Sequence, residues 1–290
     1  MTRTFRTAVL ALPLLISSSC GASSGRGASP AVNEPVDDPL RASNGDSMDP
    51  LHGKPLGQWR RELLDEGTRF KAAEELAGIG AEAVPVLLDL LGDERAFHVS
   101  DHRRALESAG YAAIKALGRI GPAAVDAVPV LVSATTNRDP SVAAAAAHAL
   151  GAIGHTTAPV IQALVVALGD EDEFVSVSAA LALKAFGPAS APAAAELGDI
   201  VLEGGDLAYF AAEALGAIGE AAAPAGQCLA LALAHQDCTF RWIYADALGR
   251  IGPSAAAFTP ALTKALGDSD PLVREAAASA LAASESNRDE

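Results

Sequence analysis

The sequence predicts an all-α fold in which pairs of helices stack side by side into a right-handed α-α superhelix, an α-solenoid. The heptapeptide ALGRIGP stands at residues 116–122 and again at 247–253, and ALGAIG stands at 149–154 and 214–219. Its second glycine recurs with spacings of 41, 33, 33, 32 and 33 residues, at Gly80, Gly121, Gly154, Gly187, Gly219 and Gly252. A period near 33 is typical of helical arrays. The chain is 50% hydrophobic but only 4% aromatic, which favours closely packed, alanine-rich helices.

The first helix of each repeat is predicted just before the glycines. A leucine stands near its end, at Leu76, Leu117, Leu150, Leu183, Leu215, Leu248 and Leu281. A larger apolar residue often stands eight positions earlier, at Val142, Val175, Leu207, Phe240 and Val273. At 100° per residue these positions share one face, so this stripe is predicted to be buried. Aspartates three positions before that residue are predicted N-caps: Asp65, Asp139, Asp172, Asp237 and Asp270.

The paired glycines are predicted to end the first helix, because glycine adopts positive φ and lets the chain reverse within a few residues. A proline then marks the first turn of a second helix, at Pro85, Pro129, Pro159, Pro192, Pro224 and Pro260. Seven such units predict about fourteen helices in seven pairs.

Residues 56–284 resemble the HEAT repeat family, including the short bacterial HEAT-like repeats similar to those of phycobilin lyases. The family pattern D-P-x-V-R-x-x-A-x-x-A-L is matched by Asp270, Pro271, Val273, Arg274, Ala277, Ala280 and Leu281. The resemblance implies a solenoid, and we expect its second helices to line the concave surface. A fold of this kind does not by itself imply an activity.

The first twenty residues have the order of an export signal: two arginines, an apolar run, small residues and then Cys20. The stretch ending at Cys20 resembles a bacterial lipoprotein processing site, which predicts lipidation of Cys20 and an exported cell-envelope lipoprotein, at the periplasmic face or the outer membrane. A secretory signal without lipid and a cytoplasmic N-terminus are the alternatives. Residues 21–50 are predicted to be a disordered linker rich in Gly, Ser, Pro and Asp, residues 51–284 the solenoid, and residues 285–290 a polar tail.

The charge of the chain is strongly negative. Its formal net charge is −15, and residues 120–290 hold seven Lys/Arg against twenty Asp/Glu. Such a surface repels phosphate backbones, so we expect no nucleic-acid partner and membrane contact only through the lipid anchor. An acidic array favours a basic protein or peptide, bound by a monomer.

Catalytic and metal-binding patterns are scarce. None of the six histidines is followed by glutamate, so the His-Glu metal pairs of HEAT-like hydroxylases are missing. His98, Asp101 and His102 lie on a polar insertion, residues 95–104, and read either as a zinc site or as solvated loop residues. The acidic run at 170–173 reads as a solvated cap or as a calcium site. We predict no catalytic residue, no cofactor and no metal.

Two cysteines remain once Cys20 is set aside. Cys228 lies inside a predicted second helix and Cys238 lies at the start of the next helix. Their placement argues against a disulfide, although the predicted compartment would permit one.

A ladder of side chains stands two residues after the first apolar position of each repeat: Phe70, Tyr111, Ala144, Val177, Tyr209, Trp242 and Glu275. This position lies away from the buried stripe, so its four rings either grip a partner or fill gaps between adjacent first helices. The candidate partner-binding residues are therefore Phe70, Tyr111, Tyr209, Arg241 and Trp242, together with His98 and His102.

These observations favour a non-enzymatic protein-protein interaction scaffold tethered to the bacterial envelope. One alternative is an enzyme or enzyme subunit similar to the phycobilin lyases, which would hold a chromophore. A second alternative is a structural spacer in the envelope.

Overall fold

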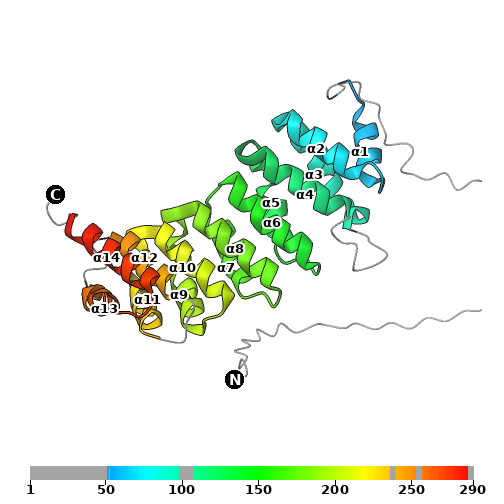
Figure 1. Cartoon of the computed structure of the whole chain (residues 1–290). Helices are drawn as coiled ribbons and strands as arrows, with labels where there is room; N and C mark the ends of the chain where they lie inside the picture. The colour runs from blue at the N-terminus through cyan, green and yellow to red at the C-terminus, as the bar shows by residue number, and fades with distance from the viewer. Residues whose placement is uncertain (1–50, 52, 98–107, 236–239, 253–256, 287–290) are drawn as a thin grey trace, which may run out of the picture. The chain divides into compact units, whose positions relative to one another are not determined.

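A computed structural model describes residues 51, 53–97, 108–235, 240–252 and 257–286, which belong to one compact unit, Gly45–Glu290. The described residues form fourteen α-helices, short 3-10 segments and no β-strand (Figure 1). The helices are α1 (Leu56–Leu64), α2 (Arg69–Ile79), α3 (Val84–Leu91), α4 (Ala109–Ile120), α5 (Val128–Ala134), α6 (Pro140–Ile153), α7 (Ala158–Leu168), α8 (Glu173–Phe186), α9 (Ala194–Glu203), α10 (Asp206–Ile218), α11 (Gly226–Leu233), α12 (Arg241–Ile251), α13 (Thr259–Ala265) and α14 (Pro271–Ser286). The all-α solenoid predicted from the repeats is confirmed.

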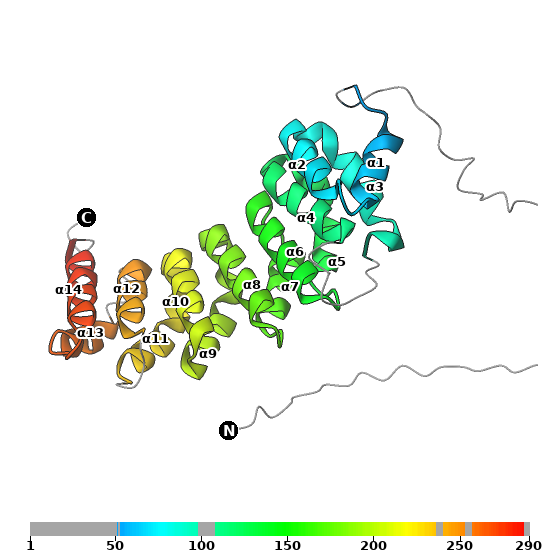
Figure 2. The ribbon, with the colours of Figure 1, turned by 45° about the vertical axis from the view of Figure 1, so that its right-hand side comes forward.

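The helices lie in two rows. Each even-numbered helix from α2 to α12 packs against the next even-numbered helix, and the odd-numbered helices from α3 to α13 form the second row (Figure 2). Helix α1 precedes the first predicted repeat and packs against α2, α3 and α4, so it closes the N-terminal end. The seven pairs therefore run from α1–α2 to α13–α14, which is one helix earlier than the pairing that the glycine spacing indicated.

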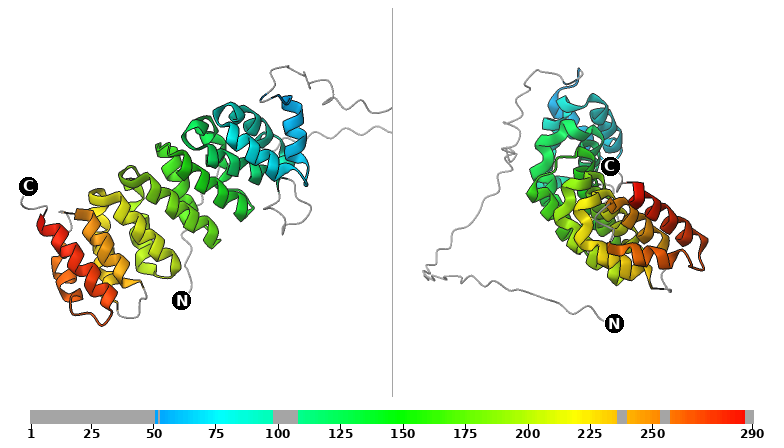
Figure 3. Two further views of the ribbon diagram at one scale, coloured as in Figure 1. Left: turned by 45° about the horizontal axis from the view of Figure 1, so that its top comes forward. Right: turned by 90° about the vertical axis from the view of Figure 1, so that its left-hand side faces the viewer.

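The bend of this unit places the even-numbered row on its inner side, where α2 and α14 face the hollow of the arc (Figures 2 and 3). The helices that follow the glycines, which were expected to line the concave surface, therefore lie in the outer row. Counted in the pairs that begin with α1, the second helix of each pair is the inner one (Figure 2). The inner row is the row whose helices approach most closely, since glycine and alanine stand at their contacts.

The two glycines of each repeat have different roles. The second glycine has positive φ, as at Gly121 (69°) and Gly154 (73°), and ends its helix as predicted. The first glycine is helical and lies against the next even-numbered helix. A Cβ on Gly151 would stand 2.9 Å from the Cα of Ala182, and one on Gly249 would stand 2.8 Å from the Cα of Ala280. At Gly151 and Gly249 the first glycine is therefore required by packing rather than by backbone conformation, whereas a Cβ on Gly78 of α2 would meet no atom within 4 Å.

The step from α8 to α10 departs from this pattern. Lys184 stands in α8 where the neighbouring repeats have the first glycine, three residues before Gly187. Its Nζ lies 2.9 Å from a carboxylate oxygen of Glu213 on α10. An ion pair between α8 and α10 thus stands at the position where a glycine touches the next helix in other repeats.

Helices α6, α8 and α14 each begin with two successive hydrogen bonds from a backbone N–H to a side-chain oxygen. Asp139 accepts from the backbone N–H of Ser141, Asp172 from Phe174 and Asp270 from Leu272, each at 2.9 Å. Two positions before each cap, Asn137, Asp170 and Asp268 accept from the backbone N–H of the capping aspartate itself, also at 2.9 Å. The acidic run at 170–173 is accordingly engaged in capping. Asp65 instead ends α1 and accepts from Gly67, so α2 begins later than predicted.

The core follows the predicted stripe, except that Leu207 and Phe240 are half-buried. The six leucines from Leu76 to Leu248 are at most 1% exposed, and Leu281 in the final helix is half-buried. Two helical runs, Ala109–Ala134 and Glu173–Glu203, are long and apolar enough to cross a membrane by length and composition alone. Each run consists of a first helix, a 3-10 segment and a second helix packed within the array, and core helices of this kind give the same signal.

Candidate partner-binding surface

The ladder positions lie on the even-numbered helices, and their exposure varies along the row. Phe70 on α2 is 45% exposed, whereas Tyr111, Tyr209 and Trp242 are half-buried. The inner row therefore presents aromatic side chains at both ends, separated by the smaller Ala144 and Val177.

An aromatic cluster joins α10 to α12. The ring centroid of Tyr209 lies 5.3 Å from that of Phe210, 5.4 Å from that of Phe240 and 6.1 Å from that of Trp242, all in edge-to-face geometry. Such pairs are favoured by the aromatic quadrupole. All four rings are half-buried. They fill the gap between adjacent helices and still present ring surface to solvent.

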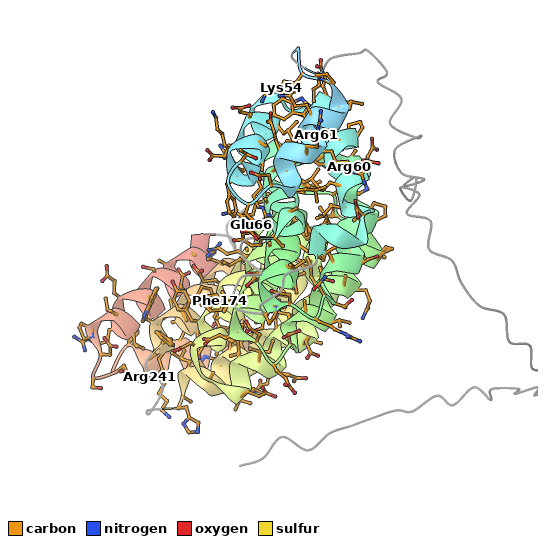
Figure 4. The ribbon with its side chains drawn as sticks, turned by 90° about the vertical axis from the view of Figure 1, so that its right-hand side faces the viewer. Lys54, Arg60, Arg61, Glu66, Phe174 and Arg241 are labelled. Carbon is orange, nitrogen blue, oxygen red and sulfur yellow. The ribbon has the colours of Figure 1, made fainter. Side chains whose placement is uncertain are left out.

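Arg241 does not lie on this surface. Its side chain is only 10% exposed and forms an ion pair and hydrogen bond with Asp268, in the turn before α14 (Figure 4). The backbone N–H of Asp270 and then the Arg241 guanidinium hold the pKa of Asp268 below its usual value. The prediction that Arg241 contacts a partner is corrected: it joins two repeats. The error arose because sequence position cannot reveal a buried ion pair.

Of the remaining predicted residues, some lie in the described part of the chain and others do not. Cys20, His98, His102 and Cys238 lie outside the described residues, so their predicted roles stay predictions. Cys228 on α11 is half-buried; burial and, to a lesser degree, Asp199 raise the pKa of its thiol. Among the residues that the structure describes, no group of three or more His, Cys, Asp or Glu side chains could hold a metal ion.

Phe174 is an exposed side chain that the sequence reasoning missed. It stands in the first turn of α8 and is 79% exposed, and Leu181 in the same helix is 38% exposed (Figure 4). The signal was present, because Phe174 directly precedes the buried Val175 and so lies off the core stripe.

Charged side chains on the even-numbered helices pair with one another. Arg119 lies 2.8 Å from Glu74, and Arg250 lies 3.7 Å from Asp246. These pairs are largely exposed, and such pairs stabilise a fold by only about 0–1 kcal/mol. They remain available to charges on a partner.

A hollow of about 410 Å³ lies between α4 and α6. Tyr111, Lys115 and Arg119 of α4 line it on one side, and Ala144, Ala145 and His148 of α6 line it on the other. The Nζ of Lys115 stands 5.5 Å from the centre of the Tyr111 ring. The floor is apolar and the rim is cationic.

A family model described as HEAT repeats matches residues 104–184 and 227–289. Over these two stretches the chain is similar to HEAT repeats. The interval between the two matched HEAT stretches includes α9 and α10, and it begins immediately after Lys184. No curated protein matches the sequence.

Solved structures with similarity to the chain include engineered repeat proteins. A crystal structure of an engineered protein is 25% identical, with 80% of this chain and 96% of that chain covered and a TM-score of 0.39. A designed armadillo repeat protein is 18% identical, covering 79% of this chain and 99% of its own, with a TM-score of 0.44. Another, in complex with the peptide (KR)4, has the same identity and coverage and a TM-score of 0.46.

Proposed function

We propose that this protein is a non-enzymatic scaffold that binds a protein or peptide along the even-numbered row of its HEAT repeats. The observation that carries the proposal is the aromatic cluster of Tyr209, Phe210, Phe240 and Trp242, whose rings are half-exposed on the inner side of the array. Rigid aromatic side chains bury a large area at a small cost in conformational entropy, which suits them to anchoring a partner.

The charge around this cluster favours a partner segment with basic side chains. Asp246 stands four residues after Trp242, and Glu275 occupies the ladder position of α14 and is exposed, whereas Glu213 near Tyr209 is engaged by Lys184. The excess of acidic residues from 120 to 290 extends the attraction beyond contact distance and would raise the association rate. A basic side chain could stack on a ring while it pairs with one of these carboxylates.

Affinity capture from a cell-envelope extract tests the proposal, with the full chain immobilised at moderate and at high salt. Wild type is compared with Trp242→Ala and with Leu231→Ala, a control that removes a 52%-exposed side chain from α11 in the other row. We expect one defined protein to be retained by wild type and the control, to be released by salt and to be lost with Trp242→Ala. Retention that is equal in all three proteins, or no specific retention at all, would favour the structural spacer.

We also propose that a lipid on Cys20 tethers the array to the envelope, on the strength of the export-signal order of residues 1–20. Metabolic labelling with a fatty acid should mark wild type and leave Cys20→Ala unmarked, with Cys228→Ala as the matched control. Equal labelling of Cys20→Ala, or no labelling of wild type, would rule out this tether.

A further inference from the structure

We propose that the hollow between α4 and α6 is a subsite for a carboxylate-bearing side chain of the bound peptide. The proposal rests on the interaction function above and adds a second, oppositely charged recognition point. Because α4 and α6 are neighbours in the inner row, the hollow lies on the same row as the aromatic cluster of α10 and α12 (Figure 2).

The hollow lies where the ladder changes from a ring in α4 to a small residue in α6. Tyr111 occupies the ladder position in α4, and Ala144 occupies the same position in α6. Ala145 and Ala149 continue the small-residue floor beside it. The resulting volume of about 410 Å³ lies within the range of ligand pockets, roughly 300–1,000 Å³, so an inserted side chain has room.

The rim carries positive charge that its own helices do not balance. Lys115, Arg119 and His148 border the hollow, and neither α4 nor α6 contains an aspartate or a glutamate. No ion pair involves Lys115 within the part of the chain that the structure describes, and its ammonium group faces the Tyr111 ring instead.

Arg119 is the one rim cation with a carboxylate partner, Glu74 of α2. The two side chains are 58% and 72% exposed, so this pair is weak and its guanidinium keeps donors free for a second carboxylate. The hydroxyl groups of Ser141 and Ser178 also line the hollow and could donate to an incoming oxygen.

The same charges argue against a polyanion as the occupant. The chain as a whole carries a formal charge of −15, so an extended phosphate backbone would be repelled before it reached Lys115 and Arg119. A single carboxylate within an otherwise neutral or basic segment avoids that repulsion and gains charge-assisted hydrogen bonds at short range.

The test is an NMR titration of the isotopically labelled full chain with an end-capped tripeptide that carries one glutamate between two alanines, alongside the matching glutamine and lysine peptides. We expect saturable shifts of the amides of Gly118, Ala145 and His148 with the glutamate peptide only. Lys115→Gln and Arg119→Gln should each weaken binding about tenfold, as expected when one charge-assisted hydrogen bond of about 1.4 kcal/mol is removed.

Two further variants separate a specific site from general attraction. Lys264→Gln removes an exposed positive charge from α13, in the other row, and should leave the affinity unchanged. Ala144→Tyr restores the missing ladder ring and should block the hollow without changing its charge. Absence of these shifts, equal shifts with the glutamine peptide, or equal weakening by Lys264→Gln would overturn the proposal.

The outcome is independent of the capture experiment. If the glutamate peptide fails to bind the hollow while a Trp242-dependent partner is still captured, the subsite is refuted and the scaffold function stands. If no Trp242-dependent partner is captured, the proposed function itself fails.

Discussion

Replacing Gly151 by alanine should destabilise the array, although the same replacement usually stabilises a helix. Alanine is favoured over glycine in a helix interior by about 1 kcal/mol. At Gly151, however, the added Cβ would stand 2.9 Å from the Cα of Ala182 and 3.0 Å from its Cβ. Carbon atoms prefer about 3.5–4.0 Å, so α6 and α8 would have to separate by about 0.6–1 Å. Overpacking of this kind costs roughly 1–3 kcal/mol, and we expect a net loss of about 1 kcal/mol.

Gly78 provides the matched control. It is also helical, near the end of α2, and a Cβ there would meet no atom within 4 Å. Gly78→Ala should therefore raise the free energy of unfolding by up to about 1 kcal/mol. Gly118 is intermediate, since its Cβ would stand 3.2 Å from the Cα and Cβ of Ala149, and its variant should fall between the other two.

Urea unfolding followed by circular dichroism measures the three differences. The order of stability should be Gly78→Ala, then Gly118→Ala, then Gly151→Ala, with Gly151→Ala below wild type. If Gly151→Ala equals or exceeds wild type, the first glycine is not a packing requirement. Repeat arrays can unfold in parts, so amide hydrogen exchange on α6 and α8 should show the same order locally.

Three further predictions follow from single contacts. Asp172→Ala removes the acceptor for the N–H of Phe174 and should lower the free energy of unfolding by about 1 kcal/mol in urea titrations, whereas unchanged stability would mean that this cap contributes nothing. The pKa of Asp268 is lowered in the folded state, so the stability that this carboxylate contributes is present above its usual pKa of about 3.9 and is lost as the pH falls through the folded value. Thermal melts of Asp268→Asn should therefore show a shallower loss of stability on acidification than wild type. Parallel curves for the two proteins would contradict this. Trp59 is 2% exposed and donates to the carbonyl of Leu51 at 3.2 Å, so Trp59→Ala should cost about 3–5 kcal/mol in the first repeat, seen as faster hydrogen exchange in α1 with little change in α12.

The repeat period predicted the array, because a motif that recurs near every 33 residues can be read without knowing any contact. The buried leucines and the second glycines also followed from local rules of periodicity and backbone conformation. The first glycines were misinterpreted, since a close approach such as Gly249 to Ala280 joins residues 31 positions apart and leaves no local signal.

The candidate surface was harder to predict than the fold. Tyr209 and Trp242 were found from their place in the ladder, whereas the burial of Arg241 depends on a partner 27 residues away. Which row lies on the inner side of the bend depends on small differences in helix separation between the two rows, added over many repeats. The sequence of one repeat does not reveal such small differences.

The ion pair between Lys184 and Glu213 makes one contact of the inner row sensitive to ionic strength. The glycine contacts on either side of it, at Gly151 and Gly216, are close contacts between uncharged atoms of neighbouring helices. Dissolved ions screen a partly exposed pair of opposite charges and leave contacts between uncharged atoms unaffected. Raised salt should therefore weaken the contribution of this pair to the packing of α8 on α10 and leave the glycine contacts unchanged.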